Sequence, residues 1–222
     1  MLVGVIEIGV LSRQYYKAVS CKQKISIRIY LNEIIPVIPF ATGIAYTALI
    51  AVVANQIDKL VMSNILPIHE YGYFTLVVII STGIVQLSKP IGQAVLPRMT
   101  YLLSNEDMQK MLTLYRGTQI VAVFIVPLSG VIAIYSYEIL YLWSGEINAA
   151  EWGKDILFWF SLSSGILAVN SFQYHLQFAY GKLKLHVIYT SVMAIIQIPL
   201  LIYVAYMYGP LQVAVTWFFS GC

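Results

Sequence analysis

The chain has 222 residues, of which 59% are hydrophobic and only 10% are charged, and its mean hydropathy is +0.79. Soluble domains carry about 25% charged residues, so this composition excludes an ordinary soluble fold and predicts a membrane protein. The net charge of +3 is small, and the two cysteines, Cys21 and Cys222, have neither metal-ligand spacing nor a plausible disulfide role.

The first 33 residues divide into an apolar and a basic segment. Residues 1–11 are apolar except for Glu7 and too short to cross a bilayer, so we interpret them as the tail of a preceding transmembrane helix. Residues 12–33 carry five basic side chains against the single Glu33. This charge balance is typical of a cytoplasmic loop.

Residues 34–222 contain charge-free runs that reach the length of a membrane span, about 17–25 residues. Four such runs are 34–57, 71–88, 117–137 and 156–181. A fifth, 185–222, is too long for one span and is interrupted by Gly209-Pro210. We therefore predict an all-α polytopic helix bundle with about five to six transmembrane helices, of which the last is incomplete.

The basic residues alternate between the two sides of the predicted membrane. The links would be 58–70, 144–155 and 208–210 outside, and 98–116 and 182–186 inside. With 12–33 in the cytoplasm, ten basic residues fall in inside loops and two, Lys59 and Lys154, in outside loops. This asymmetry supports both the spans and their orientation.

The remaining basic residue, Lys89, belongs to a polar stripe inside the second span. The stripe is Thr82, Gln86, Lys89 and Gln93, at steps of four, three and four residues, which places them on one helix face. Lys89 would either face an aqueous cavity and attract an anionic group such as a phosphate, or extend its side chain toward the inner membrane surface.

Further polar groups lie in other spans. The fourth span carries a second stripe of Asn170, Gln173, Tyr174 and Gln177, whereas His175 points away from most of it and is interpreted as a hydrogen-bonded packing residue. Ser161, Ser163, Ser164 and Gly165 predict close helix packing. Asp58 is a candidate for binding a coupling cation, with an interfacial charge neutralised by Lys59 as the alternative. Arg98, after Pro97, is interpreted as an anchor at the inner boundary.

Enzyme signatures are missing from the sequence. There is no Gly-x-Ser-x-Gly, His-Glu-x-x-His or phosphate-binding glycine loop. We therefore predict a protein without catalytic residues, metal or cofactor, and without a nucleic-acid partner.

A series of short segments marks the span ends. They are Gln56-Ile57-Asp58-Lys59, Glu70-Tyr71-Gly72-Tyr73-Phe74, Ala94-Val95-Leu96-Pro97-Arg98, Tyr141-Leu142-Trp143, Ala179-Tyr180-Gly181-Lys182 and Tyr208-Gly209-Pro210-Leu211. Their order resembles that of the polysaccharide-biosynthesis flippases, the Wzx-type O-antigen and capsule-unit translocases of the MOP (multidrug/oligosaccharidyl-lipid/polysaccharide) exporter superfamily. The resemblance implies one lobe of a twelve-helix transporter, with residues 34–222 as the C-terminal lobe and 12–33 as the link between lobes.

The resemblance also implies a function. Such proteins flip an undecaprenyl-diphosphate-linked oligosaccharide across the bacterial inner membrane by alternating access, in the surface-polysaccharide and lipopolysaccharide pathway. The expected partners are the lipid bilayer, this lipid-linked oligosaccharide, the missing N-terminal lobe and the polysaccharide polymerase machinery. From the stripes we infer that Lys89 holds the diphosphate, and that Gln86, Gln93, Asn170 and Gln177 bind sugar hydroxyls. The alternatives are a cation-coupled multidrug exporter, a membrane-embedded sugar transferase and a non-transporting scaffold.

Overall fold

The computed structural model describes residues 35, 38–181 and 184–221. The chain divides into two units, residues 1–39 and 40–222, and the fold described below is that of the second. The predicted helix tail at 1–11 and basic loop at 12–33 lie outside the described residues. Within the described part all regular secondary structure is helical, which confirms the predicted fold class.

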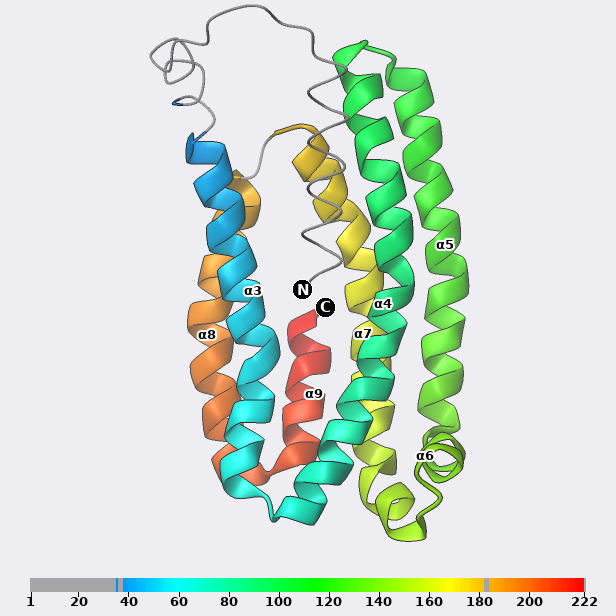
Figure 1. Ribbon diagram of the computed structural model, residues 1–222, viewed down its shortest axis with the longest axis vertical. Coiled ribbons are helices and arrows are strands. Elements are labelled where there is room, and N and C mark those ends of the chain that lie inside the picture. The colour runs from blue at the N-terminus through cyan, green and yellow to red at the C-terminus, as the bar shows by residue number, and fades with distance from the viewer. Residues whose placement is uncertain (1–34, 36–37, 182–183, 222) are drawn as a thin grey trace, which may run out of the picture. The chain divides into compact units, whose positions relative to one another are not determined.

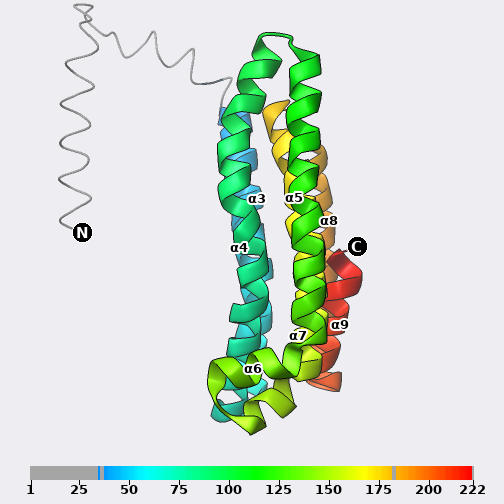
Figure 2. The same ribbon diagram turned by 90° about the vertical axis from the view of Figure 1, so that its right-hand side faces the viewer.

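Five of the described helices are long and apolar enough to cross a membrane, and two are short. The long helices are α3 (Ile38–Ile65), α4 (Ile68–Ser104), α5 (Met108–Ile134), α7 (Ile147–Ala179) and α8 (Lys184–Tyr208), and the short ones are α6 (Ser136–Ser144) and α9 (Pro210–Gly221). The long helices run side by side (Figure 1), and α6 lies at one end of the bundle (Figure 2). The protein is thus a multi-pass membrane protein.

Helix α7 is the centre of the packing. It contacts α4, α5, α6 and α9, and α9 also contacts α8 (Figure 1). The four small residues at 161 and 163–165 are all buried, as their sequence predicts. At Gly165 an added methyl group would collide with the Ser129 side chain of α5, so only glycine permits this close approach.

The main apolar core lies toward the end of the bundle where α3 passes into α4. Met62, Phe74 and Leu157 are fully buried there, and the Phe74 ring packs edge-to-face on Phe160 with ring centroids 6.0 Å apart. Ser163 of α7 donates a hydrogen bond of 3.1 Å from its Oγ to the carbonyl oxygen of Trp217, which fixes α9 against α7.

The helices are longer than the charge-free runs that predict them. Helix α3 continues past Asp58-Lys59 to Ile65, so within the predicted outside link 58–70 only residues 66–67 are not helical. Helix α4 runs through Pro90 and Pro97, and the predicted inside link 98–116 shortens to 105–107. Charges mark where a helix leaves the hydrocarbon, but backbone hydrogen bonds continue through polar residues until a cap or turn interrupts them.

Two further boundaries differ in detail. The predicted span 117–137 is broken at Tyr135, where α5 ends and α6 begins, and the predicted outside link 144–155 is reduced to residues 145–146. The break at Gly209 is confirmed, since its φ of 81° lies in the left-handed region that favours glycine. The links at 66–67, 145–146 and 209 lie at one end of the bundle and 105–107 at the other (Figure 1), as the predicted alternation of sides requires.

Candidate functional site

An open cavity of about 530 Å³ lies between α3, α4 and α7, with Trp217 of α9 also in its wall. We call it the charged cavity. Its polar lining is Asn55, Gln56, Asp58 and Lys59 of α3, Ser81, Thr82, Gln86 and Lys89 of α4, and Ser163 and Ser164 of α7. Two ammonium groups and one carboxylate give this lining a formal charge of +1.

The predicted stripe of α4 supplies three of these residues. Thr82, Gln86 and Lys89 line the charged cavity, because steps of four and three residues keep them on the face of α4 turned toward α3 and α7. Gln93, one turn further on, does not line it. Lys89 therefore lies where the cavity interpretation requires it, and its role in holding a phosphate stays a prediction.

Asp58 and Lys59 both line the charged cavity, although the sequence placed them at the outer end of a span. The Asp58 side chain is only 5% exposed and its Oδ1 accepts a 2.8 Å hydrogen bond from the backbone N–H of Lys59. Among the described residues the two side chains form no ion pair within 4.0 Å. Asp58 is thus a carboxylate held inside the bundle beside a cation, which is compatible with a role in cation coupling.

A second cavity, of about 520 Å³, lies between α3, α7, α8 and α9. We call it the aromatic cavity, because Tyr174, His186, Tyr189 and Trp217 contribute rings to its lining. The rings of Tyr174 and His186 have centroids 4.6 Å apart. The two cavities share Ala51, Leu167 and Trp217, so they adjoin.

The four residues of the stripe predicted on the fourth span do not all line the same cavity. Asn170 and Tyr174 line the aromatic cavity, whereas Gln173 and Gln177 line neither cavity. Gln173 is exposed, and the buried Oε1 of Gln177 has no hydrogen-bond partner among the described residues. Asn170, Gln173 and Gln177 therefore do not share a cavity with Lys89, whereas Gln93 lies one turn from Lys89 on the same face of α4.

His175 packs between helices, in agreement with its interpretation from sequence. Its Nδ1 lies 2.6 Å from the carbonyl oxygen of Ser171, so this nitrogen carries the proton and donates. A methyl group at Gly92 of α4 would lie 2.5 Å from the ring carbon Cε1 of His175. The ring thus fills the space that the missing side chain of Gly92 leaves.

Several residues of the cavities have no sequence pattern that predicts them, among them His186 and Trp217. His186 was assigned to an inside link because it follows Lys182 and Lys184, but it lies in the first turn of α8 and faces the aromatic cavity. Trp217 carries no polar pattern around it that would single it out. Its buried Nε1–H has no hydrogen-bond partner within the described part of the chain.

Metal ligands do not gather in the described residues: no three His, Cys, Asp or Glu side chains there are placed to hold one ion.

Comparison with known proteins identifies the family. The model of a family described as "polysaccharide biosynthesis protein" matches residues 9–152. No curated protein and no solved structure matches the chain. The match takes in 144 of the 222 residues, including α3, α4 and the charged residues of the first cavity. The chain therefore belongs to the polysaccharide biosynthesis protein family.

Proposed function

We propose that this protein is a transporter and not an enzyme, and that it flips a lipid-linked oligosaccharide from the cytoplasmic to the outer face of the bacterial inner membrane. The substrate would be a repeat unit of O-antigen or capsule on undecaprenyl diphosphate. The observation that carries the proposal is the charged cavity, which gathers Lys59, Lys89 and a set of hydrogen-bonding side chains within an apolar bundle. Membership of the polysaccharide biosynthesis family supports it.

The position of Lys89 makes an anionic ligand favourable. It stands 21 residues after the first residue of α4 and 15 residues before the last, so it lies near the middle of this helix. A lysine exposed to the hydrocarbon centre would cost about 2.5–3.5 kcal/mol, and water in a cavity removes that cost. A phosphate oxygen about 4 Å from the ammonium would gain roughly 4 kcal/mol at an effective dielectric constant of about 20. A diphosphate is therefore well matched to a cavity with two ammonium groups.

The aromatic cavity provides a place for the sugars. Asn170, Tyr174 and Gln197 offer hydrogen-bonding groups beside aromatic rings. Ligand sites commonly combine a mostly apolar lining with a few polar groups that fix orientation. Because the two cavities adjoin, a diphosphate in the charged cavity would direct the first sugars toward the aromatic cavity.

The open side of the charged cavity supports alternating access. Thr82, Gln86 and Lys89 are exposed, although they lie within an apolar helix. Polar side chains in such positions face water or protein and not lipid. We propose that a second helical lobe covers this side and that rocking of the two lobes opens the cavity to each face in turn.

A second candidate function is favoured by Asp58. A buried carboxylate that lines a cavity is the group that a cation-coupled exporter of hydrophobic drugs would require. Such an exporter would depend on Asp58 more than on Lys89. The two candidates therefore differ in which charge the transport reaction needs.

The test is complementation of a strain whose surface polysaccharide is lost through deletion of its flippase. The complete natural gene would carry Lys89→Ala, Lys89→Arg or the control Lys154→Ala. Lys154 is paired with Glu151 at 2.7 Å and lines neither cavity. We expect Lys89→Ala to abolish most of the polymer at unchanged protein level, and Lys89→Arg and Lys154→Ala to retain it. Full polymer with Lys89→Ala would refute the phosphate role of Lys89, and drug resistance without polymer from the wild-type gene would favour the exporter.

A further inference from the structure

A groove of about 410 Å³ runs between α4 and α5, close to the link at residues 105–107. We call it the Arg98 groove. It is separate from both cavities described above and shares no lining residue with them. Its lining is Ile91, Val95, Arg98 and Leu102 of α4, and Lys110, Thr113, Leu114, Gly117 and Thr118 of α5.

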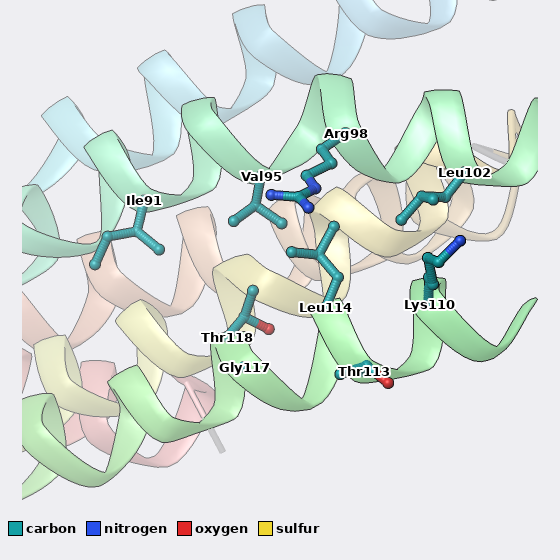
Figure 3. A pocket seen from close by; sticks show the side chains of 9 residues that line it. All are labelled: Ile91, Val95, Arg98, Leu102, Lys110, Thr113, Leu114, Gly117 and Thr118. Carbon is teal, nitrogen blue, oxygen red and sulfur yellow. The ribbon is translucent and has the colours of Figure 1, made fainter. Parts of the chain in front are cut away.

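Two cations flank this groove from opposite helices. The guanidinium group of Arg98 reaches from α4 toward α5, and the ammonium group of Lys110 rises from α5 toward α4 (Figure 3). Lys110 is paired with Asp107, with Nζ 2.7 Å from Oδ2. The side chain of Arg98 has no hydrogen bond or ion pair with any described residue. One positive charge is therefore left without a counter-charge where the two helices meet.

Apart from Thr113 and Thr118, the rest of the groove is apolar, and it is open. Val95 and Leu114 lie beside Arg98, and Ile91 lines the groove further along α4 (Figure 3). At Gly117 an added methyl group would meet no atom within 4 Å, so this glycine leaves open space in the groove. The groove thus combines a cationic end with an apolar channel along the helices.

The surface around the groove faces the lipid. On α5, Leu112 stands directly before the lining residue Thr113 and Ile120 stands three residues after the lining residue Gly117, and their side chains are 51% and 61% exposed. On a candidate membrane span, exposed aliphatic side chains of this kind contact acyl chains. Arg98 also lies near the end of α4 that the charge distribution places inside the cell, where anionic lipids attract basic side chains.

We propose that the Arg98 groove binds one anionic phospholipid of the inner leaflet. Its phosphate would contact Arg98 and Lys110, and the part of an acyl chain next to the headgroup would lie along the apolar channel. Charge complementarity selects the headgroup: a phosphatidylglycerol phosphate pairs with the uncompensated guanidinium, whereas the choline of a zwitterionic lipid adds a repelling cation. Arginine suits this role because its planar fork can donate two hydrogen bonds to one phosphate. The proposal does not depend on the translocated substrate.

Native mass spectrometry of the purified protein tests the site. The probes are phosphatidylglycerol and phosphatidylcholine with identical acyl chains, titrated separately. The variants are Arg98→Gln, which removes the free charge, and Gly117→Leu, which fills the channel. The control is Arg116→Gln, since Arg116 is an exposed cation on α5 that does not line the groove. Gel filtration confirms that each variant remains folded, and Gly117→Ser replaces Gly117→Leu if it does not.

We expect phosphatidylglycerol to bind more tightly than phosphatidylcholine to the wild-type protein. Arg98→Gln should weaken phosphatidylglycerol binding by about fivefold, the contribution of one basic residue at an anionic surface. Filling the channel at Gly117 should also weaken it, and Arg116→Gln should leave it unchanged.

Equal loss from Arg98→Gln and Arg116→Gln would overturn the proposal, because it would show attraction by the whole basic surface. Equal binding of the two lipids, or no effect of Gly117→Leu, would overturn it as well. Preferential binding of undecaprenyl phosphate in a third titration would assign the groove to the carrier lipid instead.

Discussion

The contact between Gly92 and His175 gives a direct test of the α4–α7 packing. In Gly92→Ala the new methyl group would lie 2.5 Å from Cε1 and 2.7 Å from Nε2 of His175. The ring cannot move freely, because its Nδ1 donates to the carbonyl oxygen of Ser171 at 2.6 Å. Either α4 and α7 separate slightly or the ring rotates and this hydrogen bond is lost.

The expected magnitude follows from these alternatives. Overpacking a close interface costs about 1–3 kcal/mol, and loss of the hydrogen bond about 0.5–1.5 kcal/mol. Replacing glycine by alanine within a helix stabilises the folded state by roughly 0.5–1 kcal/mol. Because the helical gain is subtracted from the cost of overpacking, we expect Gly92→Ala to lower the free energy of unfolding by up to about 2.5 kcal/mol. The matched control is Gly83→Ala on the same helix, where the methyl group meets no atom within 4 Å and the substitution should be neutral or stabilising.

Reversible unfolding in mixed detergent micelles measures both variants. A third variant, His175→Ala, completes a double-mutant cycle. In the His175→Ala background Gly92→Ala should lower the free energy of unfolding only slightly, because the ring with which the new methyl group collides is gone. The coupling between the two sites should then be at least about 1 kcal/mol. Equal stability of Gly92→Ala and Gly83→Ala would refute the close packing of the His175 ring on Gly92.

Two further predictions concern α9 and the start of α5. Trp217→Phe should leave stability nearly unchanged, because the indole Nε1–H makes no hydrogen bond in the described part of the chain. Trp217→Ala should lower the unfolding midpoint, because it removes a buried ring that lines both cavities. The hydrogen bond from the Lys110 ammonium lowers the pKa of the Asp107 carboxyl, and Asp107 also accepts from the backbone N–H of Lys110 at 3.2 Å. A carboxyl whose pKa is lower in the folded state stabilises that state at any pH above its pKa in the unfolded chain, which is about 3.9. In hydrogen exchange, the first-turn amides of α5 should therefore lose protection when the pH is lowered below ~4. Asp107→Asn should remove this pH dependence.

The membrane spans could be predicted from the sequence because each depends on a local property. A charge-free run long enough to cross the bilayer requires no knowledge of its neighbours, and the break at Gly209 follows from one residue. The helix ends were harder to place. Residues 58–65 and 98–104 are helical although they include Asp58, Lys59 and Arg98, because charged side chains end a span without ending a helix.

The cavities could be predicted only in part. Periodicity placed Thr82, Gln86 and Lys89 on one face of α4, but it could not show that Gln93 lies beyond the wall of the charged cavity. Trp217 and His186 come close to α3 and α7 through the tertiary packing of helices distant in sequence. The Arg98 groove likewise depends on how α4 and α5 pack side by side, which no pattern within either helix reveals.

Transport of the lipid-linked oligosaccharide by the purified protein is the most direct test of the proposed function. Vesicles would contain undecaprenyl diphosphate carrying a fluorescent oligosaccharide, and an impermeant enzyme outside would modify only the sugars that reach the outer leaflet. We predict that wild-type protein raises the modified fraction faster than protein-free vesicles, and that Lys89→Ala returns the rate close to that background. A wild-type rate equal to that of protein-free vesicles, with incorporation of folded protein verified, would contradict the assignment as a flippase.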